Sequence, residues 1–484
     1  MTRAEACPDA VVIGGGLAGI TAAIELAETG CAVTLIESRP WLGGATFSFA
    51  RRGLTIDNGQ HIFLRCCSAY RDLLSRLGVA ALYTLQDRLD LTVLADGSET
   101  ETAAQARLRR SALPAPLHLA KALGSYQLLS VTERARVAIA AAALRFAGSH
   151  DGNDRSLASW LTDHRQPERT RSLLWDWLCA TTVNARPEGA DLGVAASAIR
   201  TAVLAGRDHA DVGVPSVPFS RLHSAPAAAL LARLGVTIRL NTRASAVHAD
   251  GVGRYLVTAV GGSASADEPD LLPEQLRAAG VVLAVPPTEA AVLAPAGLTG
   301  QAARWSLLRS SPVVSVHVIY GSRVTDLPFA VVAGSPVRWV IDKSNAAGLD
   351  GGQYLAVSLP AADQYVDMPA GRLREIVLPQ LKRLFPAADE ASVGDVFVTR
   401  ERRATIQHEP GVLRLRASAD AGLPGLAVAG AWTDTGWPDS MEGAVRSGRS
   451  AARKLLADLA ARPETGSEES SVPAAVAAPS AGVL

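Results

Sequence analysis

The chain of 484 residues suggests two or three domains at about 150 residues each, and it excludes a small scaffold held together by disulfides. Lys plus Arg and Asp plus Glu both total 47, so the formal charge is zero, and no block of like charge offers a surface for nucleic acid. Hydrophobic residues make up 48% and charged residues 19%, which fits a packed core, an apolar cavity or a membrane contact alike. We therefore expect a globular protein without a nucleic-acid partner.

The cysteines are odd in number and lack a C-x-x-C pair, so they predict neither a disulfide framework nor a four-ligand metal site. They are Cys7, Cys31, Cys66, Cys67 and Cys179. This pattern is typical of a reducing compartment, and we expect a cytoplasmic protein. The apolar stretch at residues 10–27 resembles a signal peptide core, but three consecutive glycines and Glu25 interrupt it. We interpret this stretch as strand, loop and helix.

The N-terminal elements form a strand–turn–helix–strand unit. Residues 10–13 and 32–37 are short apolar runs typical of buried strands, and residues 17–29 repeat apolar positions at helical spacing. Two buried strands joined by a helix predict a parallel sheet. Residues 113–200 are largely helical in pattern, and strand patterns return at 236–240, 281–285, 313–320, 337–341, 354–359 and 426–430. A helix is expected at 442–459, and the tail from 463 to 484 lacks any apolar period and should be disordered.

A glycine fingerprint, Gly14-x-Gly16-x-x-Gly19, lies between the first strand and the first helix, and Glu37 ends the second strand. The first glycine permits a tight turn, the second lets the backbone approach a pyrophosphate, and the third lets helix and strand pack closely. The helix N-terminus offers N–H groups to phosphates, and the Glu37 carboxylate can accept from ribose hydroxyls. The unit therefore predicts a bound dinucleotide.

Further motifs resemble the amine oxidase and phytoene desaturase superfamily of FAD enzymes. They are Trp41–Gly44, Asp57–His61 and the C-terminal segment Ala429–Gly448. Within that superfamily, Asp57–His61, Arg402–Thr405, Thr435–Pro438 and Met441–Gly448 are similar to the hydroxysqualene dehydroxylase family. The resemblance implies an α/β fold, amine-oxidase-like, in which a doubly wound, Rossmann-like FAD-binding domain is joined to a mixed α+β substrate domain.

The implied domains are discontinuous in sequence. We expect the FAD-binding domain at 1–105, 221–300 and 396–462, a helical insert of the substrate domain at 106–220, and its mixed part at 301–395. Residues expected to hold FAD are Gly14, Gly16, Leu17, Ala18, Gly19, Glu37, Ser38, Arg39, Gly43, Gly44, Ala45, Asn58, Gly59, Gln60, Gly430, Trp432, Thr433, Trp437, Pro438, Met441 and Gly443.

The chain departs from the family pattern at two positions. Ala45 replaces a common arginine and Ala431 replaces a common aspartate, so we expect neighbours such as Arg39 or Thr433 to substitute in holding the cofactor. No cysteine follows Cys179, so the thioether attachment found in some amine oxidases is absent and FAD should be bound noncovalently.

The resemblance implies that the allylic hydroxyl of hydroxysqualene, a long isoprenoid, is replaced by hydrogen from reduced FAD; the sequence does not identify the electron donor. Hydroxide is a poor leaving group, so an acid must protonate it. We expect His61 in that role, followed by Asp434 and Asp439. An apolar tunnel between residues 113–200 and 301–393 should hold the substrate. Trp437 either favours a cation through its ring or simply packs beside the flavin, and Lys343 is expected on the surface.

Residues 113–129 place apolar side chains around His118 and Lys121, as in a helix that lies on a membrane or lines a tunnel. We expect peripheral contact with the inner face of the cell membrane through this segment. Two other functions remain open. One is a carotenoid desaturase or isomerase, and the other is a non-catalytic prenyl-binding protein similar to GDP dissociation inhibitors.

Overall fold

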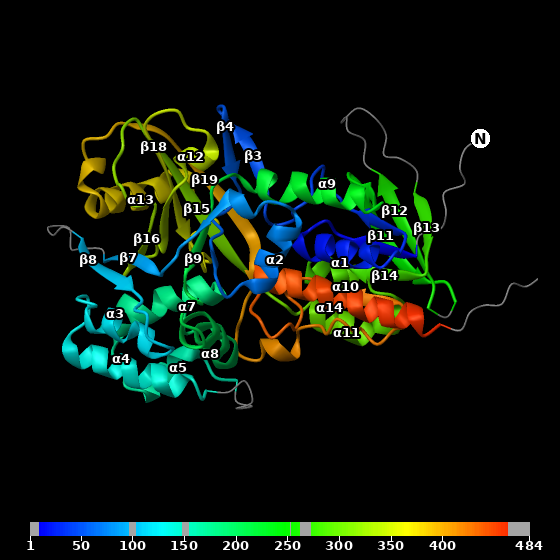
Figure 1. The fold of residues 1–484 in the computed structure, drawn as a ribbon, viewed down its shortest axis with the longest axis horizontal. Coiled ribbons are helices and arrows are strands. Elements are labelled where there is room, and N and C mark those ends of the chain that lie inside the picture. The colour runs from blue at the N-terminus through cyan, green and yellow to red at the C-terminus, as the bar shows by residue number, and fades with distance from the viewer. Residues whose placement is uncertain (1–8, 96–102, 148–153, 252, 262–272, 463–484) are drawn as a thin grey trace, which may run out of the picture.

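The computed structural model describes residues 9–95, 103–147, 154–251, 253–261 and 273–462 (Figure 1). The tail expected to be disordered, 463–484, lies outside the described residues. Two large sheets organise the molecule. Figure 1 places one sheet with helices α1 and α14 on the right, the other with α13 at upper left, and helices α3, α4, α5, α7 and α8 below the second sheet.

The first sheet is parallel throughout and has the strand order β10-β2-β1-β14-β20. Its strands are β1 (Ala10–Ile13), β2 (Val33–Ile36), β10 (Thr237–Arg239), β14 (Gly280–Leu283) and β20 (Leu426–Val428). All residues of β1 and β2 are buried, as continuous apolar runs in a two-sided sheet require. The predicted parallel unit is confirmed, with α1 (Leu17–Glu28) as its crossover helix.

The C-terminal helix α14 (Met441–Ala460) packs along α1, so the two ends of the described chain meet on this sheet. A side chain at Gly448 would lie 2.3 Å from the carbonyl oxygen of Ala18, so only glycine allows this approach.

Further helices around the parallel sheet are α2 (Ser68–Arg76), α9 (Ala225–Arg233), α10 (Pro287–Leu293) and α11 (Thr299–Trp305). Smaller sheets contain β3 (Ser48–Arg51) with β4 (Leu54–Asp57), β5 (Phe63–Leu64) with β9 (Val212–Pro215) and β6 (Tyr83–Leu85), and β11 (Thr242–Ala249) with β12 (Tyr255–Gly261) and β13 (Glu274–Ala278).

The second large sheet is mixed and has the order β19-β15-β18-β17-β16-β7-β8. Its strands are β7 (Asp90–Ala95), β8 (Ala104–Arg109), β15 (Ser310–Tyr320), β16 (Phe329–Ala333), β17 (Trp339–Asp342), β18 (Gln353–Leu359) and β19 (Val393–Ile406). Helix α12 (Ser344–Ala347) follows β17, and α13 (Ala370–Leu384) packs Leu373 and Val377 into a cluster with Val316 and Leu355 of the sheet. The boundaries expected at 105/106 and 395/396 fall inside β8 and β19, so this sheet extends beyond the expected substrate segments on both sides.

The predicted helical insert consists of short helices, which are α3 (Ala120–Gly124), α4 (Val131–Leu144), α5 (Leu157–Asp163), α6 (Glu168–Thr170), α7 (Asp176–Val183) and α8 (Leu192–Ile199). Residues 113–129, expected to form a helix that lies on a membrane or lines a tunnel, do not form one continuous helix. Pro114 and Pro116 delay helix formation, a 3-10 turn covers Leu117–Leu119, and α3 ends at Gly124. Tyr126 and Leu129 are buried, so the latter part of this segment faces the protein interior. No helix in the described ranges is both long enough and apolar enough to cross a bilayer.

Candidate functional site

The glycine fingerprint forms the predicted tight turn before α1. Gly14 has φ +109°, a conformation that favours glycine, and a side chain there would meet the carbonyl oxygen of Ala284 at 2.3 Å. A side chain at Gly19 would lie 1.9 Å from the carbonyl oxygen of Gly14. The expected reasons for glycine at both positions are therefore present in the structure.

Gly16 caps α1 and has no side chain, so the N–H groups of Leu17 and Ala18 in the first turn lack a side-chain cap within the described residues. Across from it, Gly44 has φ +58°, and a side chain there would come within 2.8 Å of the Gly16 Cα. The two glycines thus leave bare backbone on both sides of the helix N-terminus, which is the environment that a pyrophosphate requires. The residues present fit the dinucleotide half of FAD.

Glu37 is buried and turned toward the glycine turn. Its Oε2 accepts from the Gly15 N–H at 2.6 Å, and its Oε1 accepts from the Arg39 N–H at 2.8 Å and from the hydroxyl of Ser38 at 3.2 Å. Arg39 also donates through Nη1 to the carbonyl oxygen of Gly44 at 3.0 Å. Arg39 therefore tethers the Gly43–Ala45 turn, next to the position where the family arginine is missing.

The segment Asp57–His61 joins this turn to the second sheet. Asn58 donates through Nδ2 to the carbonyl oxygen of Ala45 at 2.9 Å and to Glu401 of β19 at 3.1 Å. Both amide atoms of Gln60 are buried and have no hydrogen-bond partner in the described part of the chain. Because buried amides are normally paired, this orphaned group indicates a polar ligand edge beside Gly59 and Gln60. It fits a cofactor with ring carbonyl and nitrogen atoms, such as FAD.

The C-terminal loop is held by backbone and side-chain bonds. Gly430 donates to Ser447 Oγ of α14 at 2.9 Å, and Thr433 donates through both N–H and hydroxyl to the Gly430 carbonyl at 2.9 Å. The indole N–H of Trp432 donates to the Val285 carbonyl at 2.9 Å. The loop, β14 and α14 are thereby fixed to one another.

Arg416 is the central support of that loop and was not expected from sequence. Its buried guanidinium donates to the carbonyl oxygens of Ala431, Trp432 and Thr433. Three carbonyls pointing at one cation fix the backbone where the family aspartate is replaced by Ala431. No sequence signal distinguishes this arginine from its many neighbours.

Met441 and Gly443 lie in the first turn of α14, and Pro438 lies just before it. Ser440 caps the helix by accepting from the Gly443 N–H at 3.2 Å, and a side chain at Gly443 would lie 2.7 Å from the Pro438 carbonyl. The buried carboxylate of Glu442, in the first turn of α14, accepts from the Ala69 and Tyr70 N–H groups and caps α2.

The three candidate acids lie in different environments. Asp434 is exposed, and its carboxylate accepts a local bond from the Gly436 N–H. Asp439 accepts from the Ile406 N–H at 2.8 Å, and burial raises its pKa to about 6, although that bond and Arg416 act to lower it. Burial lowers the pKa of His61 to about 4, against the raising effect of Asp57, and Lys343 lowers it further. At neutral pH the His61 ring is therefore uncharged.

Lys343 is not a surface residue, contrary to expectation. It is buried at the end of β17, and its Nζ lies 3.1 Å from Oδ2 of the buried Asp57. Asp57 also accepts from the hydroxyl of Ser48 and the Phe219 N–H, and His61 packs edge-on against the Phe219 ring at 5.1 Å. The ion pair and the imidazole therefore form one polar cluster beside Gln60.

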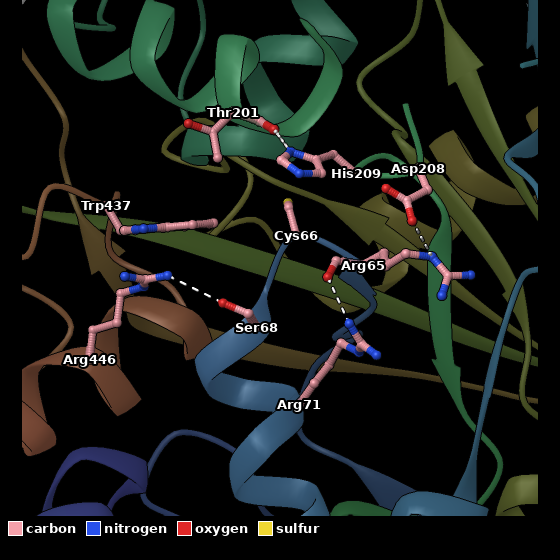
Figure 2. Close-up of a pocket in the computed structure, with 9 residues that line it drawn as sticks. All are labelled: Arg65, Cys66, Ser68, Arg71, Thr201, Asp208, His209, Trp437 and Arg446. Carbon is pink, nitrogen blue, oxygen red and sulfur yellow. Dashed lines mark hydrogen bonds and ion pairs between the residues drawn. The ribbon is translucent and has the colours of Figure 1, made fainter. Parts of the chain in front are cut away.

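A cavity of about 420 Å³ opens between α2, α14 and the helical insert (Figure 2). The Trp437 ring lies over the Arg446 guanidinium, with 4.9 Å between Cζ and the ring centre, so one face of the indole already contacts a cation. The remaining lining residues are Arg65, Cys66, Ser68, Arg71, Thr201, Asp208 and His209. This wall is more polar than the expected apolar tunnel, which stays a prediction.

The chain is similar in sequence and in fold to known flavin enzymes. The sequence profile described as flavin containing amine oxidoreductase matches residues 17–456. Hydroxysqualene dehydroxylase of Rhodopseudomonas palustris (strain ATCC BAA-98 / CGA009) is 28% identical over 455 residues, which cover 92% of this chain and 98% of that protein. Zeta-carotene desaturase of Synechocystis sp. (strain ATCC 27184 / PCC 6803 / Kazusa) is 25% identical over 517 residues, covering 93% and 97%. Cyclohexylamine oxidase from Brevibacterium oxydans IH-35A has a similar fold, with a TM-score of 0.71 at 18% identity over 94% of this chain and 100% of that one. The amine-oxidase-like fold is confirmed.

Proposed function

The chain belongs to the flavin containing amine oxidoreductase family and is an FAD-dependent oxidoreductase, and from this premise we propose that it converts hydroxysqualene to squalene by reductive removal of the hydroxyl. The observation that carries the proposal is similarity to a hydroxysqualene dehydroxylase over almost the full length of both chains. That similarity covers 92% of this chain and 98% of the relative.

The reaction breaks the allylic C–O bond and forms a C–H bond, and the hydroxyl leaves as water once it has gained a proton. Bound FAD in its reduced form supplies the hydride equivalent. The chain itself must donate the proton, hold the alcohol and keep water away. A positioned acid contributes about 10² to 10⁴-fold to such a step.

Asp439 is our proposed proton donor. A carboxyl group with a pKa of about 6 remains partly protonated near neutral pH, whereas an ordinary aspartate does not. His61, with a pKa of about 4, is almost entirely uncharged there and is the weaker candidate. We propose that His61 instead contributes a neutral ring, together with the unpaired amide of Gln60, to the polar edge of the bound ligand.

A pH profile separates the two candidate acids. Because the acid must be protonated, turnover limited by this step should fall as pH rises through about 6 for Asp439, or through about 4 for His61. Asp439→Asn should abolish the limb near pH 6 and slow turnover at least about 100-fold. His61→Ala should leave the limb in place. A limb that survives in Asp439→Asn removes Asp439 from the proposal.

The second candidate function is carotenoid desaturation, supported by similarity to a zeta-carotene desaturase over most of both chains. Desaturation consumes oxidised flavin, whereas dehydroxylation consumes reduced flavin. The non-catalytic prenyl-binding alternative is set aside because the chain is an oxidoreductase.

The experiment is anaerobic incubation of the holoenzyme, reduced with dithionite, with hydroxysqualene dispersed in detergent. Gas chromatography and mass spectrometry would follow the products. Squalene formed in proportion to flavin oxidised supports the proposal. No squalene, combined with desaturation of a carotene by the oxidised holoenzyme, favours the second candidate.

A further inference from the structure

Helix α4 presents an apolar face to solvent. Val131 and Ile139 of α4 are 72% and 69% exposed, and Phe146, two residues beyond the helix, is 87% exposed. The exposed alanines 135, 138 and 142 fall on the same side at helical spacing, while Val137, Ala140 and Leu144 point inward and are buried. A helix with apolar residues on both sides would normally be enclosed by protein.

The neighbouring turn extends this surface. Leu113 and Leu117, just before α3, are 51% and 56% exposed, and Arg134 of α4 donates to the carbonyl oxygen of Gly124 at the end of α3. Five of the eight large hydrophobic side chains that are strongly exposed in the described residues lie between positions 113 and 146. We call Leu113, Leu117, Val131, Ile139 and Phe146 the α4 face. Figure 1 places α3 and α4 at the outer end of the helical insert, away from the parallel sheet.

The exposed charged side chains on the segment that carries the α4 face are positive. Arg136 and Arg145 are exposed on opposite sides of the apolar strip, and Lys121 is exposed on α3. Between residues 111 and 147 the one acidic residue is Glu133, which is buried and paired with Arg169. An apolar strip bordered by cations matches a bilayer with anionic headgroups, because the cations stay at headgroup level while the strip enters the acyl boundary.

We propose that the α4 face docks the protein on an anionic lipid bilayer, with α4 lying flat in the interface. The proposed function explains why docking would be useful, since the substrate of that reaction dissolves in bilayers. The docking surface itself is inferred independently of that function. The docking segment differs from the one expected from sequence: α4 and Phe146 supply most of the surface, whereas Tyr126 and Leu129 are buried and take no part. A second copy of the chain is the competing occupant.

The test is flotation of the holoenzyme with vesicles of phosphatidylcholine alone or of phosphatidylcholine mixed equally with phosphatidylglycerol. We expect binding to the mixed vesicles and weaker binding to the neutral ones. The double variant Ile139→Ser/Phe146→Ser should lower the partition coefficient about tenfold or more, because it removes the most deeply inserted side chains. Val292→Ser/Leu307→Ser is the matched control, since these side chains are 79% and 61% exposed elsewhere, and it should bind as wild type does.

Substitutions of the bordering arginines test whether the anionic headgroups contribute to binding. Arg136→Gln/Arg145→Gln should weaken binding to the mixed vesicles several-fold and leave binding to neutral vesicles unchanged, while Arg233→Gln on α9 should change neither. The proposal is overturned if wild type binds neither vesicle, if the control pair loses as much binding as the α4 pair, or if light scattering shows a wild-type dimer that Ile139→Ser/Phe146→Ser converts to a monomer. Turnover of detergent-dispersed hydroxysqualene needs no bilayer, so its persistence in the α4 variant separates this inference from the proposed function.

Discussion

Lys343 and Asp57 form a buried ion pair, with 3.1 Å between Nζ and Oδ2 and side-chain exposures of 6% and 2%. The pair connects the end of β17 in the mixed sheet to the end of β4 beside the glycine turns. Removing two charges from water costs several kcal/mol, and their attraction offsets this only with good geometry. The pair therefore ties the mixed sheet to the β3–β4 hairpin, directly before the segment from Asn58 to His61.

Lys343→Met should reduce the free energy of unfolding by about 3 to 5 kcal/mol, because it leaves the Asp57 carboxylate buried without its counterion. Asp57→Asn/Lys343→Met should recover much of that loss, since neither charge then remains. Urea denaturation of each variant measures the effect. Lys382→Met is the control: its pair with Asp389 is exposed, so the change should stay below about 1 kcal/mol. A double variant as unstable as Lys343→Met would show that charge burial is not the cause.

The predictable part of the site was local in sequence. The turn from Gly14 to Gly19 follows from steric needs within one strand–helix–strand unit, and the structure has the expected turn. The expected contact of Glu37 with a ribose stays a prediction. The pairing of Asp57 with Lys343 could not be predicted in this way, because 286 positions separate them and only the folded sheet brings β17 to β4. Arg416 was missed for a different reason: its partners are nearby backbone carbonyl groups, which no sequence motif marks.

The continuous helix expected over residues 113–129 is not formed, for another reason. Its apolar spacing suggested one amphipathic helix, but spacing cannot tell whether an apolar side is turned inward or outward. The two prolines break the helix, and burial of Tyr126 then turns the rest of the segment toward the protein. The sequence analysis expected an exposed apolar surface on this segment. In the structure most of that surface lies on the next helix, α4.

Gly19→Ala should prevent normal closure of the glycine turn, because the new Cβ would overlap the Gly14 carbonyl oxygen at 1.9 Å. We expect a loss of about 1 to 3 kcal/mol or more in unfolding free energy and loss of bound flavin. Gly371→Ala in α13 meets open space and should stabilise the protein slightly, by less than about 1 kcal/mol. Flavin absorbance per protein after gel filtration, with thermal melts, measures both. Wild-type flavin content in Gly19→Ala would contradict the packing argument.

Arg416→Met should loosen the Gly430–Thr433 loop, since three carbonyl oxygens lose their shared donor. Each hydrogen bond to a charged group contributes about 1.5 to 3 kcal/mol, so the loss of even one part of this set predicts at least a tenfold rise in the dissociation constant of FAD. Fluorescence titration of the apoprotein with FAD measures this constant. Arg414→Met removes a neighbouring, largely exposed arginine that pairs with Asp154, and it should leave FAD affinity unchanged. Equal effects of the two variants would assign the loss to general destabilisation.

Asp439 should make stability depend on pH in the direction opposite to an ordinary ion-paired carboxylate. Its pKa is about 6 in the folded protein and about 3.8 in the unfolded chain, so the folded state holds the proton more tightly. Its favourable contribution is complete below about pH 4 and is lost as pH rises from about 4 to 6, after which it stays constant. Buried histidines such as His61 act oppositely, since their lowered pKa makes the protein lose stability as pH falls below about 6.5.

The Asp439 effect is isolated by comparing wild type with Asp439→Asn, because every other titrating group then cancels. The free energy of unfolding of the variant minus that of wild type should rise by about 2 kcal/mol from pH 4 to pH 7. Wild type loses stability over this range because Asp439 ionises more readily in the unfolded chain, whereas asparagine does not ionise. Urea denaturation of both proteins at the two pH values measures how the stability difference between them changes with pH. Asp434→Asn, at an exposed position on the same loop, is the matched control. An Asp439→Asn difference that is the same at both pH values would mean that the carboxyl ionises as it does in water, and Asp439 would then lose its claim to be the proton donor.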